Sequence, residues 1–159
     1  MLISLNYVTD TYTLVWYFTD DLRLSNKALE AFEQTTDEGI ILVPSIVLAE
    51  IIFISKKGRI TLTFDETIKK IVEYKNFDIA ALDSDILKVA DKIEPDMEMH
   101  DKLIVATSLY FNAALITRDR RIKESGIVSN LPGLGNSLQA ELLAFADFTD
   151  ELSKLNNDK

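Results

Sequence analysis

Residues 40–50 read IILVPSIVLAE, a short apolar strand that passes directly into a helix. The run Ile40–Val43 has the β-branched and aliphatic residues of a buried strand. Pro44 is typical of a helix start, because the first helical turn leaves its backbone N–H groups unpaired anyway. The helix is expected to run from Ser45 to Ser55 and to stop near Gly58. A strand followed at once by a helix is half of a strand–helix–strand unit, whose strands are parallel.

The same alternation continues on both sides of this stretch. Further strands are predicted at residues 5–9, 77–81 and 113–117, and further helices at residues 26–35, 64–74, 84–92 and 99–111. This order predicts an α/β fold in which a parallel sheet is covered by helices on both faces. Residues 1–128 are expected to form that domain. Pro132, Gly133 and Gly135 mark a break, and residues 129–159 are predicted to form a C-terminal extension, a helix packed on the domain or at a dimer or partner interface.

Composition limits the class of protein. A chain of 159 residues suits one compact domain, and it contains no apolar run of the length that spans a bilayer. The first residues lack an export signal, so a cytoplasmic location is expected. With no cysteine and a single histidine, His100, the chain has no disulfide, no thiolate site and no multi-histidine zinc site.

Charge restricts the mode of nucleic-acid binding. The formal net charge of −9 argues against broad, non-specific attraction to nucleic acid, although a metal ion would neutralise part of it in a nuclease. Basic residues cluster at residues 56–59 and 118–121. Both clusters are open to two interpretations, as phosphate contacts or as solvated helix ends.

Four acidic residues stand where a predicted strand stops or a helix begins: Asp10, Glu50, Asp101 and Asp119. Because ligands of open α/β sheets bind at the carboxyl ends of the strands, a single fold can bring these residues to one edge. Carboxylates gathered there repel one another, and a hard divalent cation such as Mg²⁺ removes the conflict. The sequence therefore predicts a metal site.

Each acid also has an ordinary interpretation. Asp10 and Asp119 are both placed to cap a following helix, and Asp101 to act as a first-turn acid. Glu50 is more informative, because residues 46–54 are otherwise apolar and the helix is expected to be largely buried. A buried glutamate is costly unless it is metal-bound or, alternatively, salt-bridged. Thr117 supplies a hydroxyl that could orient a metal-bound water or hold a phosphate.

Four stretches resemble the PIN domain family, and within it the VapC-like toxin nucleases of toxin–antitoxin pairs. They are, in order, VTDT at 8–11, VPSIVLAE at 43–50, MHDKLIVAT at 99–107 and LITRD at 115–119. The resemblance implies a three-layer α/β/α sandwich with a central parallel sheet of four to five strands. It also implies a ribonuclease that uses Mg²⁺ or Mn²⁺. Carried over by position, the metal and catalytic residues are Asp10, Glu50, Asp101 and Asp119, with Thr117 as the associated hydroxyl.

The resemblance further implies an RNA substrate, an antitoxin partner and a homodimer. Tyr12 departs from the family pattern, which often has a small polar residue or histidine there, and it is expected to narrow the substrate entrance. In the hypothesis for the mechanism, Asp10 and Asp119 are metal ligands, Asp101 is a ligand or supports one, and Glu50 is a ligand or the base that orients the attacking water.

Three other classes compete with this interpretation. A receiver domain requires an acidic pair after the first strand, and Asp10 has no acidic neighbour. A haloacid-dehalogenase-type phosphatase requires a second aspartate at the position of Tyr12. The alternative that stays open is a non-catalytic PIN-like module that binds metal or a partner. The acidic net charge favours this module slightly, whereas the presence of all four acids favours the enzyme.

Overall fold

The structure is a computed structural model that describes residues 5–94 and 96–118. Asp119, the predicted short helix after it and the predicted extension at 129–159 lie outside the described residues, as does the predicted domain boundary. No described helix is long and apolar enough to cross a membrane.

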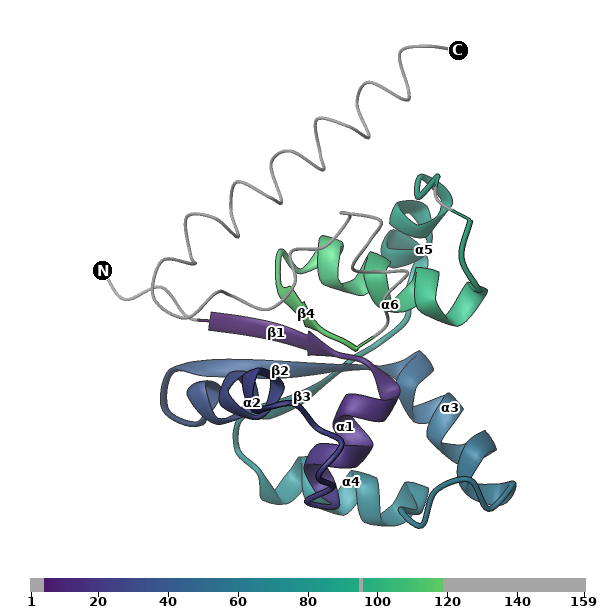
Figure 1. The fold of residues 1–159 in the computed structure, drawn as a ribbon. Coiled ribbons are helices and arrows are strands. Elements are labelled where there is room, and N and C mark those ends of the chain that lie inside the picture. Colours follow the sequence, from purple (N-terminus) through teal and green to yellow (C-terminus); the bar gives the residue numbers. More distant parts are fainter. Residues whose placement is uncertain (1–4, 95, 119–159) are drawn as a thin grey trace.

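A four-stranded parallel sheet forms the centre of the described part of the chain (Figure 1). Its strands are β1 (Leu5–Thr9), β2 (Gly39–Pro44), β3 (Phe77–Ala80) and β4 (Ala114–Ile116), in the spatial order β3-β2-β1-β4. Tyr7 of β1 pairs with Ile41 on one side and Ala114 on the other. The predicted α/β class and the parallel sheet are confirmed.

Six helices connect the strands within the described residues. Five were predicted: α2 (Asn26–Glu38), α3 (Ser45–Lys56), α4 (Phe64–Glu73), α5 (Ser84–Asp91) and α6 (Met99–Tyr110). The sixth, α1 (Thr11–Phe18), has no periodic pattern, because its sequence TYTLVWYF is apolar, aromatic and β-branched on every side. Six of its eight residues are buried, so tertiary packing holds this segment helical.

The direction of the crossovers places the helices in two layers. The chain moves from β1 to β2 to β3 in one direction and then returns past β1 to β4. Right-handed connections therefore put α1 to α4 on one face and α5 and α6 on the other. In Figure 1, α5 and α6 lie above the sheet and α1 and α4 below it. The order reverses between β1 and β4, the kind of point where α/β folds bind ligands.

A cluster of aromatic rings anchors α1 to its own layer. The ring of Tyr17 stacks on Phe32 of α2 with centroids 4.3 Å apart, and Phe18 lies 5.1 Å from Phe77 of β3. Burial raises the pKa of the Tyr17 phenol, with a smaller effect from Tyr74. Because α1 begins directly after β1, this packing also fixes where its first residue lies.

The prediction that α3 is largely buried is wrong for one side of the helix. Its buried residues are Val47, Leu48, Ile51 and Ile54. Ile52 and Phe53 face outward, and the exposed fraction of Phe53 is 55%. Glu50 is half-buried rather than enclosed. An almost uniformly apolar sequence cannot indicate which side of a helix meets solvent.

Candidate functional site

Asp10 caps α1 and at the same time lies at the junction of β1 and β4. One carboxylate oxygen, Oδ1, accepts hydrogen bonds from the Thr13 backbone N–H at 2.9 Å and from Thr13 Oγ1 at 2.6 Å. The other, Oδ2, accepts a hydrogen bond from Thr117 Oγ1 at 2.5 Å. The Asp10 backbone N–H donates to the Ile116 carbonyl at 3.1 Å, which ties the two strand ends together. Three donors from two segments thus fix the orientation of this carboxylate.

Glu50 reaches the same region from the second turn of α3. Its Oε2 accepts a hydrogen bond of 2.9 Å from Oγ1 of the buried Thr11. Within residues 5–94 and 96–118, no lysine or arginine lies within 4.0 Å of the Glu50 carboxylate. The salt bridge considered for this residue is therefore not found among the described residues, where the Thr11 hydroxyl donates a hydrogen bond to the carboxylate instead.

The start of α6 contributes a third group of side chains. His100 Nε2 lies 3.3 Å from Asp101 Oδ1 and 3.6 Å from Glu98 Oε2. One potential ligand atom from each of the three residues lies within 4.8 Å of the other two, a spacing that could hold a metal ion. Sequence reasoning identified Asp101 but missed Glu98 and His100. The available signal was the position of Glu98 and His100 at the first turn of a helix already assigned to the site.

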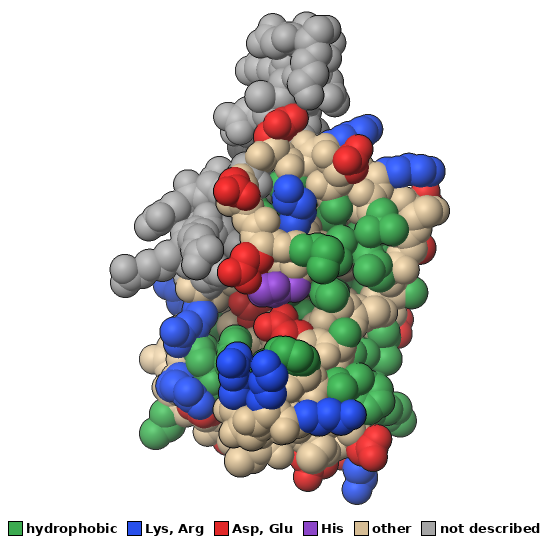
Figure 2. Space-filling view, turned by 90° about the vertical axis from the view of Figure 1, so that its right-hand side faces the viewer, with side chains coloured by type: hydrophobic (Ala, Val, Ile, Leu, Met, Phe, Trp, Pro, Cys, Tyr) green, Lys and Arg blue, Asp and Glu red, His purple; other side chains and the backbone are tan. Residues whose placement is uncertain are grey.

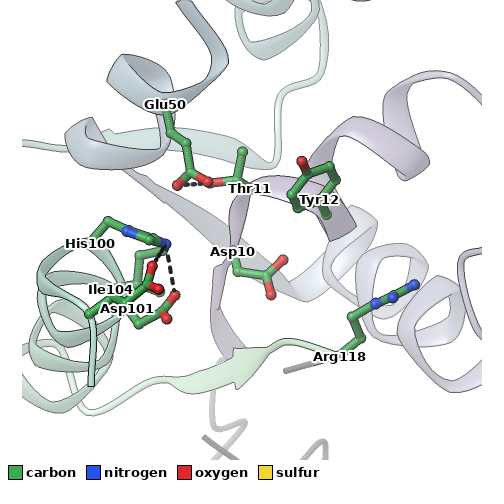
Figure 3. Close-up of a pocket in the computed structure, with 9 residues that line it drawn as sticks. Asp10, Thr11, Tyr12, Glu50, His100, Asp101, Ile104 and Arg118 are labelled. Carbon is green, nitrogen blue, oxygen red and sulfur yellow. Dashed lines mark hydrogen bonds and ion pairs between the residues drawn. The ribbon is translucent and has the colours of Figure 1, made fainter. Parts of the chain in front are cut away.

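These groups meet in one open pocket of about 220 Å³ (Figure 3). Asp10 lies at its centre, with Glu50 on one side, His100 and Asp101 on another, and Tyr12 and Arg118 opposite. The lining residues are Asp10, Thr11, Tyr12, Glu50, Glu98, His100, Asp101, Ile104 and Arg118. Of the predicted acids, Asp10, Glu50 and Asp101 line this pocket, Thr117 contacts it through Asp10, and Asp119 lies outside the described residues.

Among the described residues, the ligand atoms close enough to share one ion are those of Glu98, His100 and Asp101, and Asp10 and Glu50 line the same pocket. Four carboxylates face it, from Asp10, Glu50, Glu98 and Asp101, and one arginine, Arg118, lies on its wall. Carboxylates so gathered are mutually destabilising without a counter-charge, and oxygen donors are the ligands of Mg²⁺. The His100 imidazole adds a nitrogen donor, which transition ions such as Mn²⁺ accept more readily than Mg²⁺ does. In Figure 2 acidic side chains lie to the left of and below the histidine, hydrophobic side chains lie to its right, and a group of Lys and Arg side chains lies further below on the same face.

A sequence model described as the PIN domain matches residues 7–127 of this chain. Among curated proteins, no sequence matches. Several solved structures have a similar fold at low sequence identity. Similarity at this level supports the fold of the chain and does not establish its function.

Three of these structures are complexes of toxin–antitoxin systems. VapBC2 from Rickettsia felis, bound to a DNA fragment from its promoter, is 17% identical with a TM-score of 0.57, covering 76% of this chain and 92% of that one. DNA-bound VapBC from Salmonella typhimurium is 17% identical with a TM-score of 0.56, covering 81% and 94%. A toxin–antitoxin complex from Klebsiella pneumoniae is 21% identical with a TM-score of 0.51, covering 72% and 88%.

Proposed function

This chain belongs to the PIN domain family, and from that premise we propose that it is a metal-dependent endoribonuclease, the toxin of a toxin–antitoxin pair. One observation carries the proposal. Asp10, Glu50 and Asp101 come from three segments far apart in the chain and line a single pocket. It lies at the carboxyl edge of a parallel sheet, where α/β enzymes bind their ligands.

We propose that Asp10, Glu50, Asp101 and Asp119 hold Mg²⁺ or Mn²⁺. A divalent ion bound there would polarise the scissile phosphate and lower the pKa of a water molecule. The side chains of the pocket would orient the ion, the phosphate and the water molecule. Thr13 and Thr117 hold the Asp10 carboxylate in place. Glu50 accepts a hydrogen bond from Thr11 and is suited to bind the ion or to orient the attacking water.

We also propose an antitoxin protein and a second copy of the chain as partners. The solved complexes named above are of a toxin with its antitoxin, which supports an antitoxin for this chain by analogy. The competing function is a non-catalytic module that binds metal or a partner. Glu50 is half-buried, and no lysine or arginine among the described residues lies beside it. Burying a carboxylate without a cation costs free energy. This favours the enzyme, because a module kept only for protein contacts would gain nothing from such a carboxylate.

The test is cleavage of total RNA and of a labelled RNA oligonucleotide by the purified chain in Mg²⁺, in Mn²⁺ and in EDTA. Cleavage that requires the divalent ion is expected for the wild type. The variant carrying Asp10→Asn and Asp101→Asn should fall to the rate of buffer alone. A matched variant carrying Asp78→Asn and Asp91→Asn changes two exposed aspartates away from the pocket and should cleave normally.

The outcomes separate the two candidate functions. Cleavage by the doubly substituted pocket variant at the wild-type rate would show that the activity lies elsewhere or comes from a contaminant. No cleavage by the wild type, combined with binding of Mn²⁺ in a calorimetric titration, would favour the binding module. Co-expression with the product of a small adjacent reading frame tests the antitoxin: the proposal expects a stable complex in which RNA cleavage is suppressed.

A further inference from the structure

The pocket has a second wall whose chemistry the metal site does not use. Tyr12 lies there, two residues after Asp10, and the exposed fraction of its side chain is 38%. Its ring centroid lies 6.0 Å from that of Trp16, one turn further along α1, at an angle of 45°. Trp16 itself is buried, with 4% exposed. Tyr12 is therefore an aromatic ring supported from behind by the core, with part of its surface open to the pocket.

Arg118 lies on the same wall. The central carbon of its guanidinium is 4.7 Å from the centroid of the Trp16 ring, within the range of a cation–π contact. The side chain is exposed. Among the residues that the structure describes, no carboxylate lies within 4.0 Å of its guanidinium. The indole thus positions the guanidinium at the pocket, and its charge is available to an anion.

A second arginine near the same indole, Arg23, differs from Arg118 because a carboxylate binds its guanidinium. Arg23 also lies over the Trp16 ring, at 5.2 Å. It is engaged by Asp21, through Nε to Oδ1 at 3.0 Å and Nη2 to Oδ2 at 2.7 Å. These hydrogen bonds hold the pKa of the Asp21 carboxyl at about 2, so that carboxyl stays charged and paired at neutral pH. Of the two arginines over the indole, Arg118 is the one that lines the pocket and has no carboxylate partner among residues 5–94 and 96–118.

An exposed aromatic ring beside a guanidinium that has no carboxylate partner in the described part of the chain is a combination suited to single-stranded nucleic acid. The ring provides a surface for a base, and the planar guanidinium matches a phosphate. A base within a duplex is already stacked on both sides, so it cannot use such a ring. The net charge of −9 argues against a broad, non-specific attraction to nucleic acid. Local contacts of this kind are therefore expected to contribute to the affinity for RNA.

We propose that Tyr12 and Arg118 bind one unpaired nucleotide of the RNA next to the bond that is cut, with its base on the Tyr12 ring and its phosphate on the Arg118 guanidinium. The proposal rests on the ribonuclease function proposed above and narrows its substrate to single-stranded segments. The two residues are binding residues, and the acidic wall opposite them retains the role proposed for the metal.

The experiment measures binding of a fluorescent single-stranded RNA octamer by anisotropy, in EDTA so that no cleavage is needed. Tyr12→Leu keeps an apolar contact with Trp16 but loses the flat ring, and it should weaken binding by about tenfold. Tyr12→Phe should bind within about twofold of the wild type, since it keeps the ring. Arg118→Gln should also weaken binding by about tenfold. The controls are Tyr110→Leu, at an exposed tyrosine on α6, and Lys92→Gln, at an exposed lysine.

An abasic RNA tests the stacking contact directly. One base at a time is removed along the octamer. With the wild type, removal at one position should cost the same factor as Tyr12→Leu, and with Tyr12→Leu that removal should cost nothing further. A fully paired RNA of the same sequence should bind at least about tenfold more weakly. Far-UV circular dichroism and unfolding midpoints establish that each variant is folded.

The two proposals can fail separately. If the wild type cleaves RNA but Tyr12→Leu changes neither the anisotropy nor the KM, the nucleotide site is wrong and the ribonuclease stands. If the binding results are as expected but no divalent ion supports cleavage, the ribonuclease is wrong and the site belongs to an RNA-binding module. In the cleavage assay the nucleotide site predicts a raised KM for Tyr12→Leu with kcat within about threefold of the wild type. Equal binding of single-stranded and paired RNA would overturn the preference for unpaired nucleotides.

Discussion

At the scale of single residues, Asp10 shows that a structural role and a site role are compatible. Its Oδ1 accepts the capping hydrogen bond from the Thr13 N–H, as an isolated aspartate before a helix is expected to do. Its Oδ2 is held by Thr117 at the pocket. The capping interpretation is therefore confirmed for Oδ1, and the position of the carboxylate at the pocket is compatible with the metal site proposed above.

Thr117→Val should weaken Mn²⁺ binding about tenfold, because partners that orient a ligand contribute 10- to 100-fold to metal affinity in other proteins. Valine has the same shape but cannot donate to Asp10 Oδ2, so the carboxylate loses one of its holding groups. Calorimetric titration with Mn²⁺ measures the effect. Thr117→Ser should bind normally. Thr107→Val is the matched control, since Thr107 is equally buried and donates to the Leu103 carbonyl of its own helix. Unchanged affinity in Thr117→Val would remove Thr117 from the site.

Single residues also mark the limit of sequence reasoning at the site. The acids at 10, 50 and 101 could be proposed because each stands at the end of a recognisable element. Glu98 and His100 stand at the same helix start as Asp101, but a lone histidine beside two acids is common at such a start and does not by itself indicate a metal site. Their relevance comes from distances of 3.3 Å and 3.6 Å around His100 Nε2, which depend on side-chain conformation.

At the scale of elements, apolar periodicity predicted the amphipathic helices, whereas helices with little contrast between their faces had to be recognised by other signals or were missed. The helix α2 has polar and apolar residues on different sides and was predicted. The helix α1 is apolar on every side and gave no such pattern. The helix α3 was predicted from Pro44 and its length, but its outward side was not. Apolar periodicity detects a helix only when one side is apolar and the other is polar. A helix with similar residues on both sides has to be recognised from its start and stop signals.

Two neighbouring residues of α3 provide a test of its orientation. Ile51 is fully buried, whereas Ile52 is 36% exposed. Ile51→Ala should lower the free energy of unfolding by about 3 kcal/mol, the middle of the range for a buried isoleucine, because it leaves a cavity in the core. Ile52→Ala should lower it by less than about 1 kcal/mol. Urea unfolding followed by circular dichroism measures both. Similar losses for the two variants would contradict the assigned face of α3.

At the scale of the whole molecule, the topology gathers distant acids. Asp10, Glu50 and Asp101 lie at the carboxyl ends of parallel strands or at helix starts beside them, and such positions share one edge of the sheet. This much followed from the alternation of strands and helices alone. The strand order β3-β2-β1-β4, which places β1 and its Asp10 beside β4, depends on long-range packing and was not predicted.

The crowding of charge in the pocket, within a chain of net charge −9, predicts a specific response to divalent ions. An ion that binds the folded chain alone stabilises it by about 2.7 kcal/mol at 100 times its Kd. For a protein of this size that corresponds to a rise in Tm of about 5 °C or more. Monovalent salt at equal ionic strength also screens the net charge, so it is the necessary control.

The variant with Asp10→Asn and Asp101→Asn separates the two effects, because asparagine caps a helix as well as aspartate does but no longer carries charge into the pocket. Without divalent ions it loses one source of repulsion but also one of the two oxygens that accept from Thr13 and Thr117, so its response to each salt is compared with its own Tm in the absence of added ions. It should keep the response to monovalent salt and lose the additional rise in Mn²⁺. Scanning calorimetry in both salts measures this difference. If its Tm rises in Mn²⁺ as much as that of the wild type, the ion binds elsewhere and the pocket is not the metal site.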